Sequence, residues 1–160
     1  MEGRRAVRGQ GGQEEMNVQK IKDGLVIDHI RAGTGLHIFN WLKLDKVPFS
    51  VALIMNVPSG QMGKKDIIKI DNLIDIDYSV LGFIDPNITV NVVEDEHVTR
   101  KITLTLPERV ENVIKCRNPR CITSSETGIA HVFHLVDRKR AEYACAYCDE
   151  LYRAGIGEFL

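Results

Sequence analysis

The sequence lacks three features that would point to common classes of protein. No apolar run approaches the roughly 18 residues that a membrane-spanning helix needs, so no membrane association is expected. Net charge is almost absent, because 21 Lys and Arg stand against 22 Asp and Glu. Nucleic-acid binders usually carry a basic excess, so this balance argues against a nucleic-acid partner. Cysteine is absent from the first 115 residues, and all four cysteines lie in the last third of the chain.

Residues 1–15 (MEGRRAVRGQGGQEE) contain almost no apolar side chains. A segment of this composition cannot bury enough surface to order itself, so we expect a disordered N-terminal extension. Arg4, Arg5 and Arg8 resemble the basic start of a signal peptide, but no apolar stretch follows them. Export is therefore not expected, a cytoplasmic location is predicted, and Met16 is a candidate start.

A phosphate-binding loop of the common kind is missing as well. Residues 60–66 (GQMGKKD) contain two glycines and two lysines, which invites comparison with such a loop. The spacing G-x-x-x-x-G-K-[ST] is absent, and neither Ser nor Thr follows the lysines. We therefore reject a phosphate-loop function for this segment.

The four cysteines form two short-spaced pairs that are separated by 23 residues, namely Cys116 with Cys121 and Cys145 with Cys148. Two such pairs can converge on one tetrahedral ion, because each presents two sulfurs and the intervening hairpin brings the pairs together. We interpret them as the ligands of one structural Zn²⁺. Four cysteine ligands leave no open coordination position, so the ion is expected to stabilise the fold and not to catalyse a reaction.

Other interpretations of the cysteines are two disulfides or a redox-active dithiol. Cytosolic thiols stay reduced, and a lone C-x-x-C motif would not account for the first pair. His131 and His134 lie between the two pairs and are alternative ligands. Because they are three residues apart on an expected strand, they point to opposite faces and cannot both turn inward.

The segment after Met16 shows alternating strand and helix patterns. Strands are expected over 25–30, 49–57 and 67–70, and the second is apolar on both faces, which is typical of a central strand. A helix over 36–44 places Leu36, Ile38, Phe39, Trp41, Leu42 and Leu44 on one broad face, with Thr34 as its N-cap. Asp75 or Asp77 is expected to cap a second helix that stops at Asp85.

A hairpin is expected next, with strands over 88–93 and 98–106 and a turn at 94–96. Simple alternation places Val98, Arg100, Ile102, Leu104 and Leu106 on one face and Lys101 on the other. The order is strand, helix, strand, strand, helix, strand, with one extra strand. This order predicts the α+β class, with a ferredoxin-like antiparallel sheet covered by two helices.

Two domains are predicted, over residues 16–106 and 107–160. The second contains few core candidates, and chains below roughly 70 residues rarely stabilise themselves by apolar burial alone. The expected zinc ion would supply the missing stability of this small, mainly β, four-cysteine domain.

Several segments of the chain resemble the regulatory chain of aspartate carbamoyltransferase. They are 18–30 (VQKIKDGLVIDHI), 56–70 (NVPSGQMGKKDIIKI), 89–91 (TVN), 106–112 (LPERVEN) and the cysteine framework 116–148. These independent motifs occur in the family's order over residues 16–150, so the resemblance is specific.

The resemblance implies a non-catalytic subunit of a pyrimidine-biosynthesis enzyme. In that family the first domain binds nucleotide effectors (CTP, ATP, in some cases UTP) and forms a homodimer through its sheet. The zinc domain docks on the catalytic chain. The implied assembly is a dodecamer in which three regulatory dimers bridge two catalytic trimers.

The resemblance also implies a nucleotide site. Its residues would be Val18, Gln19, Lys20 and Ile21 beside the base, Asp28 and Lys69 at the ribose, His29 and Lys101 at the phosphates, and Val26, Asn91, Val93 and Val98 around them. The chemistry agrees, because a triphosphate needs fixed cations and a carboxylate suits a pair of ribose hydroxyls. Adjacent strand residues point to opposite faces, so Asp28 and His29 can share a ligand only near an edge or a strand end. A second nucleotide with Mg²⁺ near Lys64 and Lys65 stays open.

Three alternatives remain. A zinc-ribbon nucleic-acid binder would use Arg117, Arg120, Arg138, Lys139 and Arg140, but residues 107–160 carry balanced charge. A bridging subunit without allosteric response would show the same motifs. A small enzyme with Asp28 and His29 as an acid/base pair would need a nucleophile motif, which does not accompany them.

Overall fold

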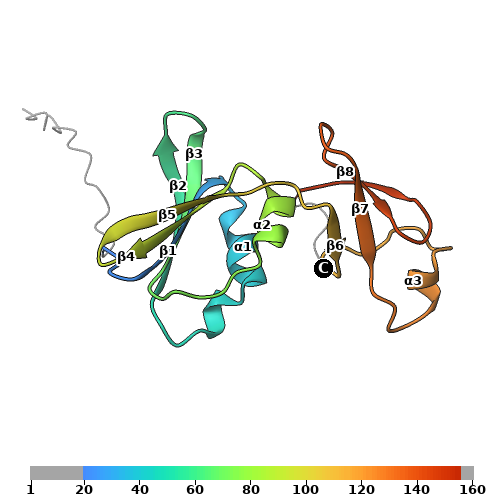
Figure 1. The fold of residues 1–160 in the computed structure, drawn as a ribbon, viewed down its shortest axis with the longest axis horizontal. Coiled ribbons are helices and arrows are strands. Elements are labelled where there is room, and N and C mark those ends of the chain that lie inside the picture. The colour runs from blue at the N-terminus through green and yellow to red at the C-terminus, as the bar shows by residue number, and fades with distance from the viewer. Residues whose placement is uncertain (1–19, 156–160) are drawn as a thin grey trace, which may run out of the picture.

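The computed structural model describes residues 20–155, which form two antiparallel sheets joined by a short linker (Figure 1). The predicted disordered extension, Val18 and Gln19 lie outside these residues. No helix between residues 20 and 155 is long and apolar enough to cross a membrane.

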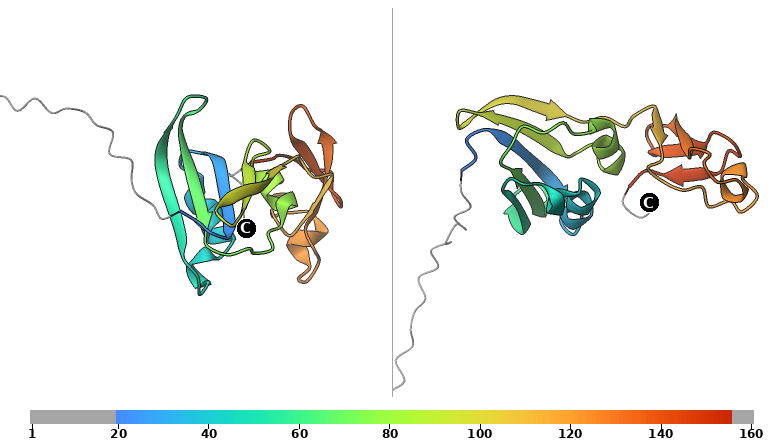
Figure 2. Two further views of the ribbon diagram at one scale, coloured as in Figure 1. Left: turned by 60° about the vertical axis from the view of Figure 1, so that its left-hand side comes forward. Right: turned by 90° about the horizontal axis from the view of Figure 1, so that it is seen from below.

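The first sheet has five strands in the order β2-β3-β1-β4-β5. The strands are β1 (Gly24–Arg31), β2 (Val51–Ser59), β3 (Gly63–Ile70), β4 (Thr89–Glu94) and β5 (His97–Thr103). Helix α1 (Gly35–Trp41), the 3₁₀ helix η1 (Leu44–Lys46) and helix α2 (Tyr78–Ile84) complete this part. Both α-helices lie on one side of the sheet (Figure 2). The predicted ferredoxin-like α+β fold is confirmed.

Alternating apolar residues of the strands build the core between sheet and helices. Their common property is almost complete burial: Leu25, Ile27, Ile68, Ile70, Val90 and Val92 from the sheet, and Ile38, Val80, Leu81, Phe83 and Ile84 from the helices. The Asp77 carboxylate caps α2 by accepting hydrogen bonds from the N–H groups of Ser79 and Val80, at 3.0 and 3.4 Å. No helix of the described residues covers the opposite face of the sheet, which we call the open face (Figure 1).

Two expectations for the first part are wrong. The strand around Leu53 is not central, because β2 lies at the edge of the sheet, where Pro58 costs no ladder hydrogen bond. Helix α1 ends at Trp41, and Leu36 is 48 % exposed instead of lying on the buried face. Thr34 does occupy the N-cap position, but its side chain forms no capping hydrogen bond.

The buried carboxylate of Asp66 takes over the capping role at α1. One of its oxygens accepts hydrogen bonds from the N–H groups of Gly33 and Gly35, each at 3.0 Å. The other oxygen accepts from the N–H of Asn56 at 3.0 Å. A Cβ at position 35 would lie 2.8 Å from the Asp66 Cβ, so glycine lets the helix start approach the strand. Asp66 therefore ties β3 to β2 and to the start of α1.

The second sheet has the order β6-β7-β8-β9. Its strands are β6 (Arg109–Glu111), β7 (Val132–Asp137), β8 (Glu142–Cys145) and β9 (Leu151–Arg153), and a four-residue helix α3 (Ile122–Ser125) precedes β7. Its core is small, and its largest fully buried side chains are Phe133, Tyr143 and Tyr152.

Helix α2 contacts both the linker and the second sheet. The rings of Phe83 and Tyr143 meet edge to face at 4.9 Å between centroids. The Tyr143 hydroxyl donates to the Pro107 carbonyl at 2.6 Å. Gly82 lies against the carbonyl of Thr105 so closely that a Cβ would clash with it. Helix α2 of the first part is thus packed against the linker and against the second sheet.

Candidate functional site

The strand register brings several predicted nucleotide residues together on the open face. Val26 pairs with Lys69 of β3 on one side and with Asn91 of β4 on the other. Asn91 in turn pairs with Lys101 of β5. Because directly opposed residues of antiparallel strands share a face, these four side chains form one row across the sheet. The row carries a lysine towards each end.

A β-bulge at Thr99 places Val98 on the same face as Lys101. Val92 pairs with Arg100, but Val93 pairs with Val98, so Thr99 is the extra residue. The expectation that Val98 shares a face with Arg100 is therefore wrong. Val93 and Val98 form a second pair on the open face, and Val98 is 61 % exposed.

A second bulge, in β1, explains how Asp28 and His29 serve one surface. The register shifts between Ile27 and Ile30, and His29 has a φ of 58°. Asp28 pairs with Thr89, and the Nδ1 atom of His29 lies 2.9 Å from the Thr89 hydroxyl. Both side chains therefore reach the open face although they are adjacent in sequence.

Lys65 is the partner of Asp28. Its ammonium lies 2.9 and 3.2 Å from the two carboxylate oxygens of Asp28, and both side chains are largely buried. Burial of the carboxyl opposes ionisation, but the hydrogen bond and charge of Lys65 outweigh it and hold the pKa of Asp28 below its usual value. Asp28 is thus an anion with a fixed orientation. No pattern in the sequence indicates the strand register that brings Lys65 to Asp28.

The two described residues at the start of the predicted site lie near one end of the row. Lys20 and Ile21 line a pocket together with Ala52, Lys69 and three further residues, namely Ser50, Val51 and Asp71. Among the described residues, neither Lys69 nor Lys101 forms an ion pair. Cations without an internal partner are available for an anionic ligand.

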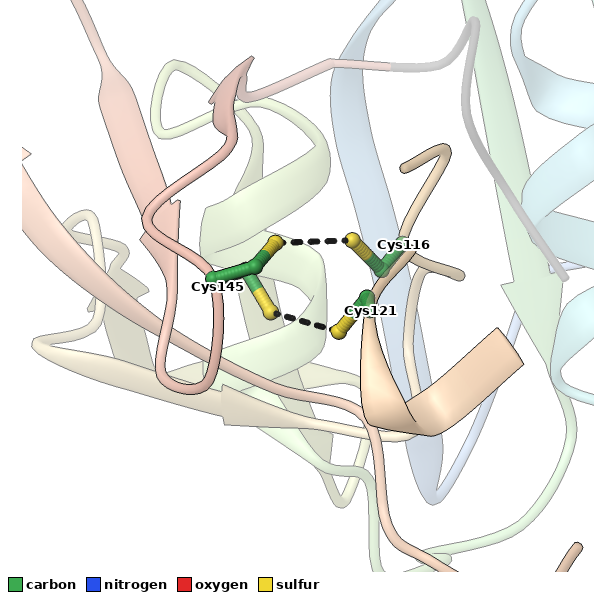
Figure 3. A group of neighbouring side chains, drawn as sticks. Cys116, Cys121 and Cys145 are labelled. Carbon is green, nitrogen blue, oxygen red and sulfur yellow. Dashed lines mark hydrogen bonds between the residues drawn. The ribbon is translucent and has the colours of Figure 1, made fainter. Parts of the chain in front are cut away.

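The four cysteines converge at one end of the second sheet. Cys116 lies in the loop after β6, Cys121 is the N-cap of α3, Cys145 ends β8 and Cys148 follows in the next turn. The Sγ atoms of Cys116 and Cys148 are 3.5 Å apart. Those of Cys121 and Cys145 are 3.8 Å apart, and Figure 3 shows these two side chains pointing toward one another. All four sulfurs lie within 4.8 Å of one another.

These distances fit four thiolates around one ion. Zn–S bonds of about 2.3 Å in a tetrahedron place sulfurs roughly 3.8 Å apart, whereas a disulfide needs about 2.05 Å. The four cysteines are free in the structure. Within residues 20–155, these four cysteines are the group of His, Cys, Asp or Glu residues whose ligand atoms lie close enough together to hold a metal ion.

Hydrogen-bond donors surround the sulfurs, as thiolate ligands require. Burial raises the pKa of Cys116 to about 12, although the N–H of Asn118 acts in the opposite direction. At Cys121 burial also raises the pKa, but the hydroxyl of Thr123, 3.1 Å from the sulfur, and its N–H outweigh burial and lower the pKa to about 7. A bound cation favours the thiolate form at all four positions.

The alternative metal ligands, His131 and His134, do not belong to the group of converging ligand atoms. The Nδ1 atom of His131 accepts a hydrogen bond from the N–H of Cys116 at 3.2 Å, so this ring supports the cysteine loop. His134 is exposed on β7.

Among the basic residues of the nucleic-acid alternative, Arg138 pairs with Glu108 and Arg140 pairs with Asp137. These internal pairs weaken that alternative.

Comparison with known proteins identifies both parts of the chain. The family of the aspartate carbamoyltransferase regulatory chain, allosteric domain, matches residues 16–105. The family of the aspartate carbamoyltransferase regulatory chain, metal binding domain, matches residues 108–156.

Relatives along most of the chain bear the same name. The aspartate carbamoyltransferase regulatory chain of Clostridium tetani is 59 % identical over 139 residues, which cover 86 % of this chain and 96 % of the relative. That of Clostridium botulinum is 56 % identical over 140 residues (88 % and 96 %), and that of Bifidobacterium longum is 48 % identical over 135 residues (84 % and 97 %). The chain therefore belongs to the family of aspartate carbamoyltransferase regulatory chains, as a non-catalytic subunit with an allosteric domain and a four-cysteine metal-binding domain.

Proposed function

We propose that this regulatory chain binds nucleoside triphosphates (CTP, ATP and UTP) on the open face of the first sheet. The observation that carries the proposal is the row of Lys69, Val26, Asn91 and Lys101, with Asp28 beside it. Lys101 and His29 would hold the phosphates, and Asp28 and Lys69 the ribose. Lys20 and Ile21 would border the base, together with Val18 and Gln19, and Val93 and Val98 would close the site.

Lys65 and Lys64 have different surroundings within this proposal. Lys65 is engaged by Asp28, so it orients the ribose-binding carboxylate. Lys64 is exposed at the start of β3 and is available to a second nucleotide with Mg²⁺. A Mg²⁺ ion would be held mainly by phosphate oxygens and water, as is usual for this ion.

We propose Zn²⁺ as the metal of the four-cysteine cluster, because four thiolates at tetrahedral spacing select zinc over magnesium or calcium. When bound, zinc would supply cross-linking of β8 and the loop after β6, with no catalytic chemistry. We place the boundary between the two domains at residues 106 and 107, which the matched ranges support.

The metal-binding domain is proposed to dock on the catalytic chain. Ile122, Tyr147 and Leu151 lie close in sequence to the cysteines and are each about half exposed, at 47, 48 and 50 %. Apolar side chains exposed beside a rigid metal site suit an interface with a partner protein. We propose that three regulatory dimers thereby bridge two catalytic trimers, in the cytoplasm.

A nucleotide can regulate this assembly only through its different affinities for two quaternary states. Such coupling is typically about 1–3 kcal/mol. The proposed site and the docking surface lie in different sheets, and α2 with the linker connects them. The test is aspartate saturation of the reconstituted complex with and without CTP, UTP and ATP. Curves that coincide under all conditions would leave a bridging subunit without allosteric response.

Replacing Lys69 or Lys101 with alanine is expected to weaken CTP binding about tenfold or more. Each replacement removes one charge-assisted contact, worth about 1.5–3 kcal/mol. Titration calorimetry of the complex measures the affinity. Lys46→Ala, at an exposed lysine of η1, is the matched control and should bind as the parent does. Equal affinity in all three variants would contradict the proposed site.

The homodimer is proposed to form along the β2 edge of the first sheet. This edge strand is apolar on both faces, and Met55 is 44 % exposed. The other edge, β5, carries a bulge and exposed charges that discourage strand pairing. Met55→Lys is therefore expected to weaken the dimer at least about tenfold, because a charge is placed in the interface. Light scattering of serial dilutions tests this; Val98→Lys on β5 is the control and should remain dimeric.

A further inference from the structure

We propose that Tyr152 and His131 are positioning residues of the metal centre, which hold the main chain at Cys116 in place: Tyr152 binds the N–H of the next residue, Arg117, and His131 binds the N–H of Cys116 itself. The inference rests on the metal site proposed above and adds side chains that do not themselves contact the ion.

Tyr152 lies in the middle of β9 and is only 1 % exposed. Its hydroxyl accepts a hydrogen bond from the N–H of Arg117, the residue directly after Cys116. The ring meets Phe133 edge to face at 4.9 Å between centroids, and the guanidinium of Arg117 lies 4.3 Å from the ring centroid. The hydroxyl oxygen is therefore held in a fixed position next to the first cysteine.

His131 anchors Cys116 from the other side. Its Nδ1 atom accepts a hydrogen bond from the N–H of Cys116 at 3.2 Å. Its own main chain is clamped by Asn112: the N–H of His131 donates to the Asn112 side chain at 2.9 Å, and the N–H of Asn112 donates to the His131 carbonyl at 2.8 Å. Two consecutive main-chain N–H groups, those of Cys116 and Arg117, are thus held by two side chains, one from the residue before β7 and one from β9.

Groups that orient metal ligands typically change metal affinity 10–100-fold when they are removed. Tyr152→Phe deletes the hydroxyl but keeps the ring and its contacts with Phe133 and Arg117. In the full zinc-loaded chain, we expect this variant to transfer zinc to a chromogenic chelator about tenfold faster than the parent. In the Co²⁺-substituted chain, the sulfur-to-cobalt charge-transfer band should shift, because the loop that carries the ligand Cys116 loses one of its two fixed main-chain contacts.

Tyr143→Phe is the matched control. Tyr143 is the cross-strand partner of Tyr152 and is equally buried, but its hydroxyl donates to the Pro107 carbonyl of the linker and does not bind the cysteine loop. Its zinc-transfer rate and cobalt spectrum should equal those of the parent. Equal rates and equal spectra for the two variants would overturn the role of the Tyr152 hydroxyl.

Substitutions of His131 provide a second, independent measurement, which decides the question if Tyr152→Phe does not fold. The side-chain oxygen of asparagine can take the place of Nδ1 as an acceptor, whereas alanine offers none. His131→Ala should release zinc faster, and His131→Asn should restore the parent rate. Equal rates for the two would overturn the inference while leaving the zinc site intact. A parent chain that takes up no zinc would instead overturn the proposed metal.

Discussion

Removal of the metal from the assembled complex is expected to release the catalytic chain while the first sheet stays folded. The apparent binding free energy of a structural zinc is about 10–16 kcal/mol, which exceeds the stability of most small domains. The second sheet has strands of only three to six residues and a small core, so it cannot replace this contribution. Most residues of the hydrophobic core belong to the first sheet and its helices, and none of these is a metal ligand.

Cys116→Ala should reproduce the effect of metal removal. Size-exclusion chromatography with the catalytic chain measures release, and CTP binding by the separated regulatory chain reports the state of the first sheet. Ser125→Ala, at an exposed residue of the short helix α3, is the control and should leave the complex intact. A complex that survives complete loss of metal would show that the docking surface does not depend on the four cysteines.

Asp66→Ala is expected to destabilise the first sheet by at least about 3 kcal/mol. The substitution leaves three N–H groups, those of Gly33, Gly35 and Asn56, without their acceptor in a region that water reaches poorly. Asp66→Asn should cost less, because an amide keeps the shape and one acceptor oxygen but turns its NH₂ group towards an N–H donor.

Urea unfolding, followed through the secondary structure of the first sheet, measures this loss. Asp45→Ala removes an exposed carboxylate from η1 and serves as the control, with an expected change within about 0.5 kcal/mol. If Asp66→Ala and Asp45→Ala unfold at the same urea concentration, the three hydrogen bonds do not carry the stability that we assign to them.

The sequence patterns predicted the helices and strands well, but not which strands lie next to one another in the sheet. The cap at Asp77, the hairpin of β4 and β5 and the order of strands and helices follow from local residue types. The position of β2 does not, because a strand that is apolar on both faces can lie in the centre of a sheet or, as here, at its edge. Pro58 was the available signal for an edge.

The candidate site depended on register, which alternation alone does not give. The bulges at His29 and Thr99 each shift one residue and thereby bring His29 and Val98 to the open face. The convergence of the four cysteines could be predicted, since their spacing is itself the signal. Asp66 and Tyr152 were missed, because a single buried polar group has no sequence pattern of its own.

Gly82 allows helix α2 to lie in direct contact with the linker between the two sheets. The backbone of α2 rests directly on the Thr105 carbonyl of the linker, with no side chain between them. A flexible side chain at such a junction could adapt to small displacements of α2 by changing its rotamer. Two backbones in direct contact cannot adapt in this way. The distance between α2 and the linker is therefore set by the two backbones alone, and any side chain at residue 82 would have to increase it.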